Sequence, residues 1–130
     1  MPIRTRFSTK GFEEALERLA NMGQDIDAIA DEGLTAAGKV FEAGFQQRVP
    51  VGSGNLRDHL GATPPKRDGD RHYIVIGMLP DTDPDTARYG IVQEFGAAHT
   101  EKHPYIRPTL DADTRKAREA LKQALEGHLK

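Results

Sequence analysis

The sequence predicts an α+β fold, in which a small antiparallel sheet packs against a long helix from the N-terminal half and a C-terminal helix. Three observations predict this class. Apolar residues recur at three- and four-residue spacing over 25–48 and again from about 108 onward, which is the period of an amphipathic helix. Residues 71–79 alternate in the manner of a β-strand. The length of 130 residues suits one hydrophobic core, so we expect a single domain over residues 1–130.

The first ten residues admit two interpretations. Residues 3–7 alternate apolar with polar side chains, so residues 1–10 contain either a short strand or a flexible arm. A helix is then expected from about Lys10. Ser8 or Thr9 is predicted to cap it, because a side-chain hydroxyl accepts hydrogen bonds from the free amides at a helix N-terminus.

The helix predicted over 25–48 carries the strongest periodic signal in the chain. Pro50 ends it, and the turn-rich segment 49–56 follows. Leu56 belongs either to a helical turn or to the start of a strand, which we expect over about 59–63. The residues on the predicted core face of the long helix are Ile26, Ile29, Ala30, Leu34, Ala37, Val40, Phe41 and Phe45.

A hairpin turn is predicted at Asp68–Gly69, because glycine supplies the positive φ that such turns need. It leads into the strand over 71–79, which we expect at the centre of the sheet. Apolar side chains fall on both faces of this strand, so both faces are expected to be covered. One face would carry Ile74, Ile76 and Met78, and the other Tyr73, Val75 and Leu79.

Asp83 before Pro84 predicts the start of a short helix, which Gly96 is expected to close in a left-handed conformation. Apolar side chains at Ile91, Val92 and Phe95 fall in its last turns. A polar loop over 97–103 follows.

Two prolines bracket the next segment. Pro104 and Pro108 are predicted to hold Tyr105 and Ile106 extended, because proline biases the preceding residue away from the helical region. The last helix is expected from about Pro108, with two acids, Asp111 and Asp113, in its first turn, where the helix dipole favours negative charge. We expect Phe95 and Ile106 in the core and leave Tyr105 open between core and partner contact.

The composition excludes several classes of function. Eighteen Lys and Arg side chains against 20 Asp and Glu give a net charge of −2, which does not favour a primary role in binding nucleic acid. The chain has no cysteine, so disulfides, thiolate metal sites and a cysteine nucleophile are excluded. No apolar run approaches membrane-spanning length. A DNA-contacting module would have to use Arg4, Arg6, Lys10, Lys66, Arg67 and Arg71.

His99, Glu101 and His103 form the most metal-like pattern in the sequence. Side chains two apart point the same way only on a strand, whereas glycine and alanine just before them indicate a loop. No nucleophile, base and orienting group can be assembled, so the sequence predicts no catalytic residue and no cofactor. A small metal-dependent hydrolase using these three side chains is the alternative that we retain.

Three short elements follow one another along the chain. Their residues are Pro50, Gly52, Ser53, Gly54 and Leu56, then Tyr89, Glu94, Phe95 and Gly96, then Pro104, Tyr105, Ile106, Arg107 and Pro108. In this order they resemble elements of the tail-completion, neck or head–tail joining proteins of long-tailed phages of the Hong Kong ninety-seven type. Three positions depart from the pattern of that family: position 53 has serine where the family usually has threonine, position 90 has glycine where alanine is usual, and positions 105–106 have Tyr–Ile where Phe–Leu is usual.

The resemblance implies a non-enzymatic virion protein that acts at the junction of tail and neck as a ring of subunits, for example a hexamer. Its partners would be further copies of itself, the tail-tube protein and the neck or connector proteins, without a membrane or a specific nucleic-acid sequence. It would be present in the host bacterial cytoplasm during assembly and then in the virion. On this interpretation Glu94–Gly96 and Pro104–Pro108 fix the geometry of the loop between the sheet and the last helix. The sequence leaves open whether the loop 97–103 contacts a neighbouring subunit.

Overall fold

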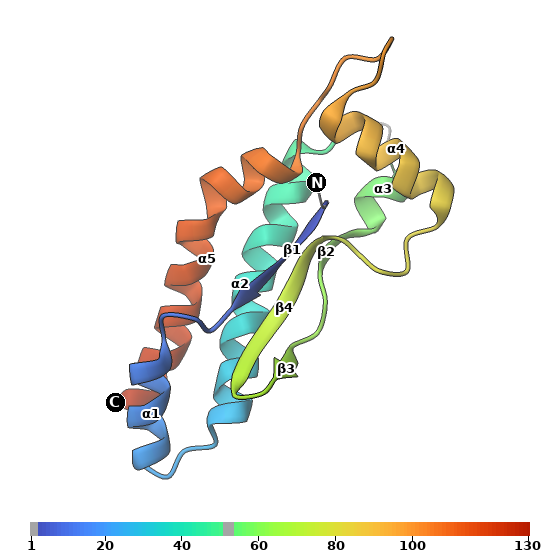
Figure 1. The fold of residues 1–130 in the computed structure, drawn as a ribbon. Coiled ribbons are helices and arrows are strands. Elements are labelled where there is room, and N and C mark those ends of the chain that lie inside the picture. Colours follow the sequence, from blue (N-terminus) through green and yellow to red (C-terminus); the bar gives the residue numbers. More distant parts are fainter. Residues whose placement is uncertain (1–2, 51–53) are drawn as a thin grey trace.

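The structure is a computed structural model that describes residues 3–50 and 54–130, and it confirms the predicted α+β class (Figure 1). After the first strand, the elements follow the expected order of two helices, strands and two further helices, with one short helix between the long helix and the second strand. They are β1 (Arg4–Ser8), α1 (Glu13–Asn21), α2 (Ile26–Arg48), α3 (Gly54–Asp58), β2 (Leu60–Ala62), β3 (Lys66–Asp68), β4 (Arg71–Met78), α4 (Pro84–Phe95) and α5 (Ile106–Leu129).

The sheet is built around β4, as predicted. β1 and β2 flank it, β3 pairs with its first residues, and all pairings are antiparallel. Residues 4–8 are therefore a strand and not a flexible arm. Gly69 has a φ of +63° and turns the chain between β3 and β4, as the Asp–Gly pair predicted. The strand β3 itself was missed, because its residues Lys, Arg and Asp carry no apolar alternation.

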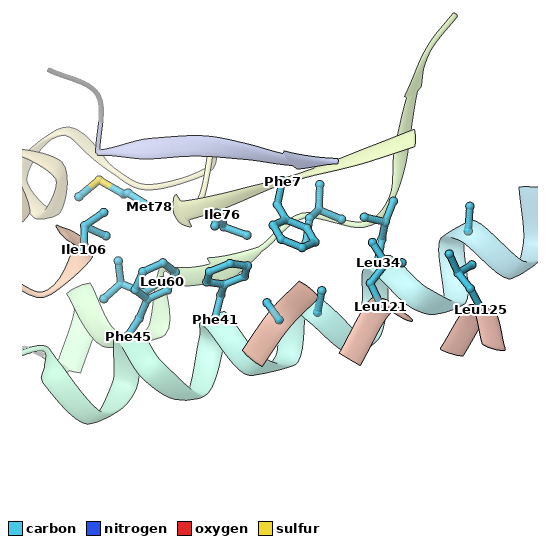
Figure 2. Packing of buried hydrophobic residues seen from close by; sticks show 14 of the residues in the cluster. Phe7, Leu34, Phe41, Phe45, Leu60, Ile76, Met78, Ile106, Leu121 and Leu125 are labelled. Atoms are coloured by element: carbon cyan, nitrogen blue, oxygen red, sulfur yellow. The ribbon is translucent and has the colours of Figure 1, made fainter. Parts of the chain in front are cut away.

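The hydrophobic core lies between the sheet and α2, and α5 packs along α2 (Figure 2). Phe7 from β1 meets Phe41 of α2 edge to face, with ring centroids 5.2 Å apart. α2 and α5 approach closely at Gly44, where a Cβ atom would stand 2.6 Å from a methyl group of Thr109. Gly33 likewise faces Leu121 of α5, whereas Gly38 faces Ala62 and Ile74 of the sheet. These glycines therefore allow close packing, although glycine lowers the helix propensity of α2.

The second face of the sheet is open, so the prediction that both faces are covered is wrong. Ile74 and Ile76 are buried against α2, whereas Tyr73 and Val75 on the opposite face are half-exposed. Among the described elements, α2 is the helix that packs extensively on β2 and β4. The apolar residues on both faces of β4 therefore did not indicate that a layer of helices covers each face of the sheet.

Two of the four predicted helix starts are confirmed, those of α2 and α4. The Asp25 carboxylate accepts from the amide of Ala28 at 3.2 Å, and the Asp83 carboxylate accepts from that of Thr86 at 3.1 Å. The prediction for α1 is wrong, because this helix begins three residues later than Lys10, after Phe12, without a side-chain cap. The Ser8 hydroxyl instead accepts from the amide of Lys10 in the turn before the helix.

Candidate functional site at the junction of α4 and α5

A buried carboxylate joins α4 to α5. Glu94, in the last turn of α4, is 5% exposed, and its Oε1 accepts from the backbone amides of Tyr105 and Ile106 at 2.8 Å each. Its Oε2 accepts from the amide of Arg107 at 3.1 Å. These amides lie at the N-terminus of α5, where they have no partner within the helix and where the dipole favours negative charge. Glu94 therefore caps α5 from a neighbouring helix.

This cap explains why the prediction for the proline-bracketed segment is wrong. α5 begins at Ile106, not at about Pro108, so Ile106 and Arg107 are helical rather than extended. Pro108 is the third residue of the helix, a position in the first turn where the missing amide hydrogen removes no hydrogen bond within the helix. Asp111 and Asp113 consequently lie beyond the first turn. Asp113 instead pairs with Arg48 at the end of α2, at 2.9 Å.

The three sequence elements of the resemblance meet at Gly90, in the middle of α4. The Tyr105 hydroxyl donates to the Gly90 carbonyl oxygen at 2.9 Å. A Cβ atom on Gly90 would stand 2.9 Å from the Tyr105 hydroxyl oxygen and 2.9 Å from a methyl group of Leu56. Burial, followed by the charges of Glu94 and Tyr89, raises the pKa of Tyr105 above its ordinary value, which keeps the hydroxyl a donor.

The helix α4 is inverted in its burial pattern, because its polar and small residues face the protein and its large apolar residues face solvent. The residues that it turns towards the protein are Thr86, Gly90 and Glu94, at a spacing of four. Its large apolar side chains point outward, with Ile91 45% exposed and Phe95 41% exposed. A helix that buries its polar and small residues and exposes its apolar ones is suited to contact another protein.

The core assignments can now be decided. Ile106 is buried, as predicted, and Tyr105 is fully buried, so it belongs to the core. The prediction for Phe95 is wrong, because Glu94 occupies the inward position and turns the following residue to solvent. The exposure of Ile91 was not predicted from the sequence. Ile91 and Phe95 lie four residues apart, so they share one face of α4, and this spacing could have indicated a common apolar surface.

The loop 97–103 carries the metal-like pattern, and all of its residues are exposed. Ala97 and Thr100 pair through two backbone hydrogen bonds, and the amide of His103 donates to the carbonyl oxygen of Gln93. Within 3–50 and 54–130, no three His, Cys, Asp or Glu side chains gather as possible metal ligands. His99, Glu101 and His103 therefore do not form a ligand set here.

The remaining motif residues frame the junction. Pro50 follows the end of α2 and is half-buried, Gly54 opens α3 and is exposed, and Tyr89 is 42% exposed on α4. Gly96 closes α4 with a φ of +80°, as predicted, and Pro104 is exposed. Gly52 and Ser53 lie outside the described residues.

The cations of the DNA-contacting hypothesis do not all come together. Strand pairing places Arg4, Arg6, Lys66 and Arg71 on the open face of the sheet. Arg67 lies towards the other face, where it pairs with Asp27 of α2 at 3.6 Å, and Lys10 belongs to the turn before α1.

Comparison with known proteins gives one match. The HK97-gp10-like family model, described as "Bacteriophage HK97-gp10, putative tail-component", matches residues 13–96, from α1 through α4 and well over half of the chain. No curated protein and no solved structure matches. Separately, none of the helices in the described part of the chain combines the length and apolarity needed to cross a lipid bilayer.

Proposed function

The chain belongs to the HK97-gp10-like family of bacteriophage tail components, and from this premise we propose that it is a non-enzymatic virion protein that completes the tail and joins it to the head. On this proposal, identical subunits form a closed ring at the junction of tail and neck. The ring assembles in the cytoplasm of the host bacterium and remains in the finished particle.

The observation that best supports this mechanism is the exposed apolar face of α4. Ile91 and Phe95 lie one turn apart and present apolar surface to solvent. Aromatic and large aliphatic side chains of this kind supply much of the binding energy at protein interfaces, where they become buried in a pocket on the partner. Apolar side chains that stay in contact with water contribute no burial energy to the fold of the isolated subunit, so burial by a partner is what would make this exposure favourable.

The exposed stripe is held rigidly. Glu94 hydrogen-bonds three amides of α5, and Tyr105 hydrogen-bonds Gly90, so both ends of the α4–α5 connection are fixed. A pre-ordered surface loses little conformational entropy on binding, which favours association. The loop 97–103 projects beyond α4 and the start of α5 (Figure 1).

A contact between different surfaces of identical subunits repeats around an axis and closes into a ring when the rotation allows it. We assign one side of that contact to the stripe of Ile91 and Phe95 with the loop 97–103. The tail-tube protein and the neck or connector proteins are the further partners that this role requires. The hydrolase alternative has no supporting observation in the described residues, because its three side chains do not gather.

The role is tested by deleting the gene from its phage and examining the lysate by electron microscopy. Tail completion predicts filled heads separate from unjoined or aberrant tails, and restoration of whole particles when the gene is supplied on a plasmid. Normal virions from the deletion strain would refute the proposal. Light scattering of the purified protein, alone and with the tail-tube protein, shows separately whether the ring forms before or on contact with its partner.

A further inference from the structure

The open face of the sheet gathers positive charge from three strands. In the antiparallel register Arg4 lies opposite Gly77, and Arg6 lies opposite Val75. Lys66 lies opposite Tyr73. Residues paired across strands share a face, and residues two apart on one strand do so as well. Arg4, Arg6, Lys66 and Arg71 therefore point to the same side, away from α2, and all four are exposed.

The charge balance of this face differs from that of the whole chain. The four cations share it with the carboxylate of Asp68, and Glu13 and Asp70 line the same hollow as Arg6 and Arg71. Four cations against three carboxylates leave this face with a net positive charge, while the whole chain has a net charge of −2. Asp68 pairs with Arg6 at 3.2 Å, and Glu13 of α1 approaches Arg71 at 4.0 Å. Both pairs are largely exposed, and exposed pairs are weak enough to rearrange when a stronger anion approaches.

Two of these cations are available without breaking an ion pair. Arg4 and Lys66 have no carboxylate partner within the described residues. They stand on β1 and β3, on opposite sides of the central strand β4. The face therefore offers charge across the width of the sheet, as needed to follow an extended polyanion.

The aromatic residue of this face indicates which polyanion fits. The guanidinium of Arg6 lies over the Tyr73 ring, 4.1 Å from its centroid. Proteins that bind single-stranded nucleic acid stack bases on open aromatic rings, and this ring is already covered. A duplex keeps its bases stacked internally and offers phosphates, which arginine and lysine bind without reading sequence.

We propose that the open sheet face, made of Arg4, Arg6, Lys66 and Arg71, binds the phosphate backbone of double-stranded DNA without sequence preference. The proposal rests on strand register and charge, and it stands or falls independently of the ring contact assigned to α4.

The test uses the full chain and a fluorescent random-sequence duplex, with anisotropy measured at several salt concentrations. The variant Arg4→Ala with Lys66→Ala removes the two cations that lack ion-pair partners, so folding should be preserved. Its matched control is Lys39→Ala with Lys116→Ala, which removes the same charge from exposed positions on α2 and α5.

The wild-type chain should bind the duplex several-fold more tightly than a single strand of the same length, and binding should weaken with salt. The sheet variant should weaken binding several-fold and reduce the slope of log affinity against log salt by about 2. The control should retain the wild-type slope. Absence of duplex binding at low salt, equal losses in both variants, or preference for the single strand or for poly-glutamate would each overturn the proposal.

Discussion

Glu94 and Tyr105 hold each other in place across the junction of α4 and α5. The Glu94 carboxylate accepts from the Tyr105 amide at 2.8 Å, and the Tyr105 hydroxyl donates to the carbonyl oxygen of Gly90, one turn before Glu94, at 2.9 Å. Tyr105 thus donates both hydrogen bonds, one from its backbone amide and one from its hydroxyl, to acceptors one turn apart on α4. They fix the rotation of α4, and this rotation turns Ile91 and Phe95 outward.

The cap on α5 should contribute strongly to stability. Glu94→Ala leaves the amides of residues 105–107 without their acceptor in a largely buried site, and we expect it to lower the free energy of unfolding by roughly 2–4 kcal/mol. Glu94→Gln should lower it less, because the amide oxygen still accepts from two of the three donors. Urea unfolding measures both changes. Glu101→Gln, on the exposed loop, is the control and should have no effect, and an equally small effect of Glu94→Ala would contradict the cap.

Gly90 and Tyr105 should be energetically coupled. Gly90→Ala introduces a methyl group that meets the Met78 methyl group and lies 2.9 Å from both a Leu56 methyl group and the Tyr105 hydroxyl oxygen. It should destabilise by about 1–3 kcal/mol, partly offset by the better helix propensity of alanine. Tyr105→Phe removes a buried hydrogen bond worth about 1 kcal/mol.

The double variant carries both changes. It should be more stable than the sum of the two changes by up to about 1 kcal/mol, because loss of the Tyr105 hydroxyl removes one of the three contacts that the new methyl group meets. A double-mutant cycle from urea unfolding tests this. Strict additivity would show that the two positions do not share the same space.

The raised pKa of Tyr105 predicts a loss of stability in alkali. A tyrosine whose folded pKa exceeds its unfolded value of about 10 stabilises the fold fully below that pH, and this contribution falls as pH rises towards the folded pKa. Burial is the main cause, and the negative charge of Glu94 adds to it. The free energy of unfolding should therefore fall above about pH 10 in the wild type and less steeply in Tyr105→Phe. Parallel curves for the two proteins would exclude Tyr105 as the titrating group.

Local chemistry made much of the fold predictable. Asp83, Gly69 and Gly96 each act through their own backbone or the next turn, so their roles could be predicted without knowing what packs against them. The long helix was predictable because its apolar period persists over more than six turns. β3 could not be predicted, because Lys66–Asp68 is a strand only through its pairing with β4.

The site depended on tertiary contacts that the sequence does not display. Phe95 was expected in the core because apolar residues usually face inward. The inward stripe of α4 instead ends in Glu94, whose carboxylate accepts from amides eleven to thirteen residues further on. The same contact allows Pro108 to lie inside α5. Sequence therefore identified Glu94 and Tyr105 as notable, while the hydrogen bonds that join them required the structure.

The central claim is that the outward stripe of α4 is a contact in tail assembly. The most direct test is to complement the gene-deleted phage with Ile91→Asp combined with Phe95→Asp and to count joined particles by electron microscopy. Met22→Asp, at an apolar side chain of similar exposure in the turn between α1 and α2, is the matched control. Circular dichroism and thermal unfolding should show both variants folded. We predict that the control restores joined virions and the α4 variant does not, and restoration by the folded α4 variant would contradict the account.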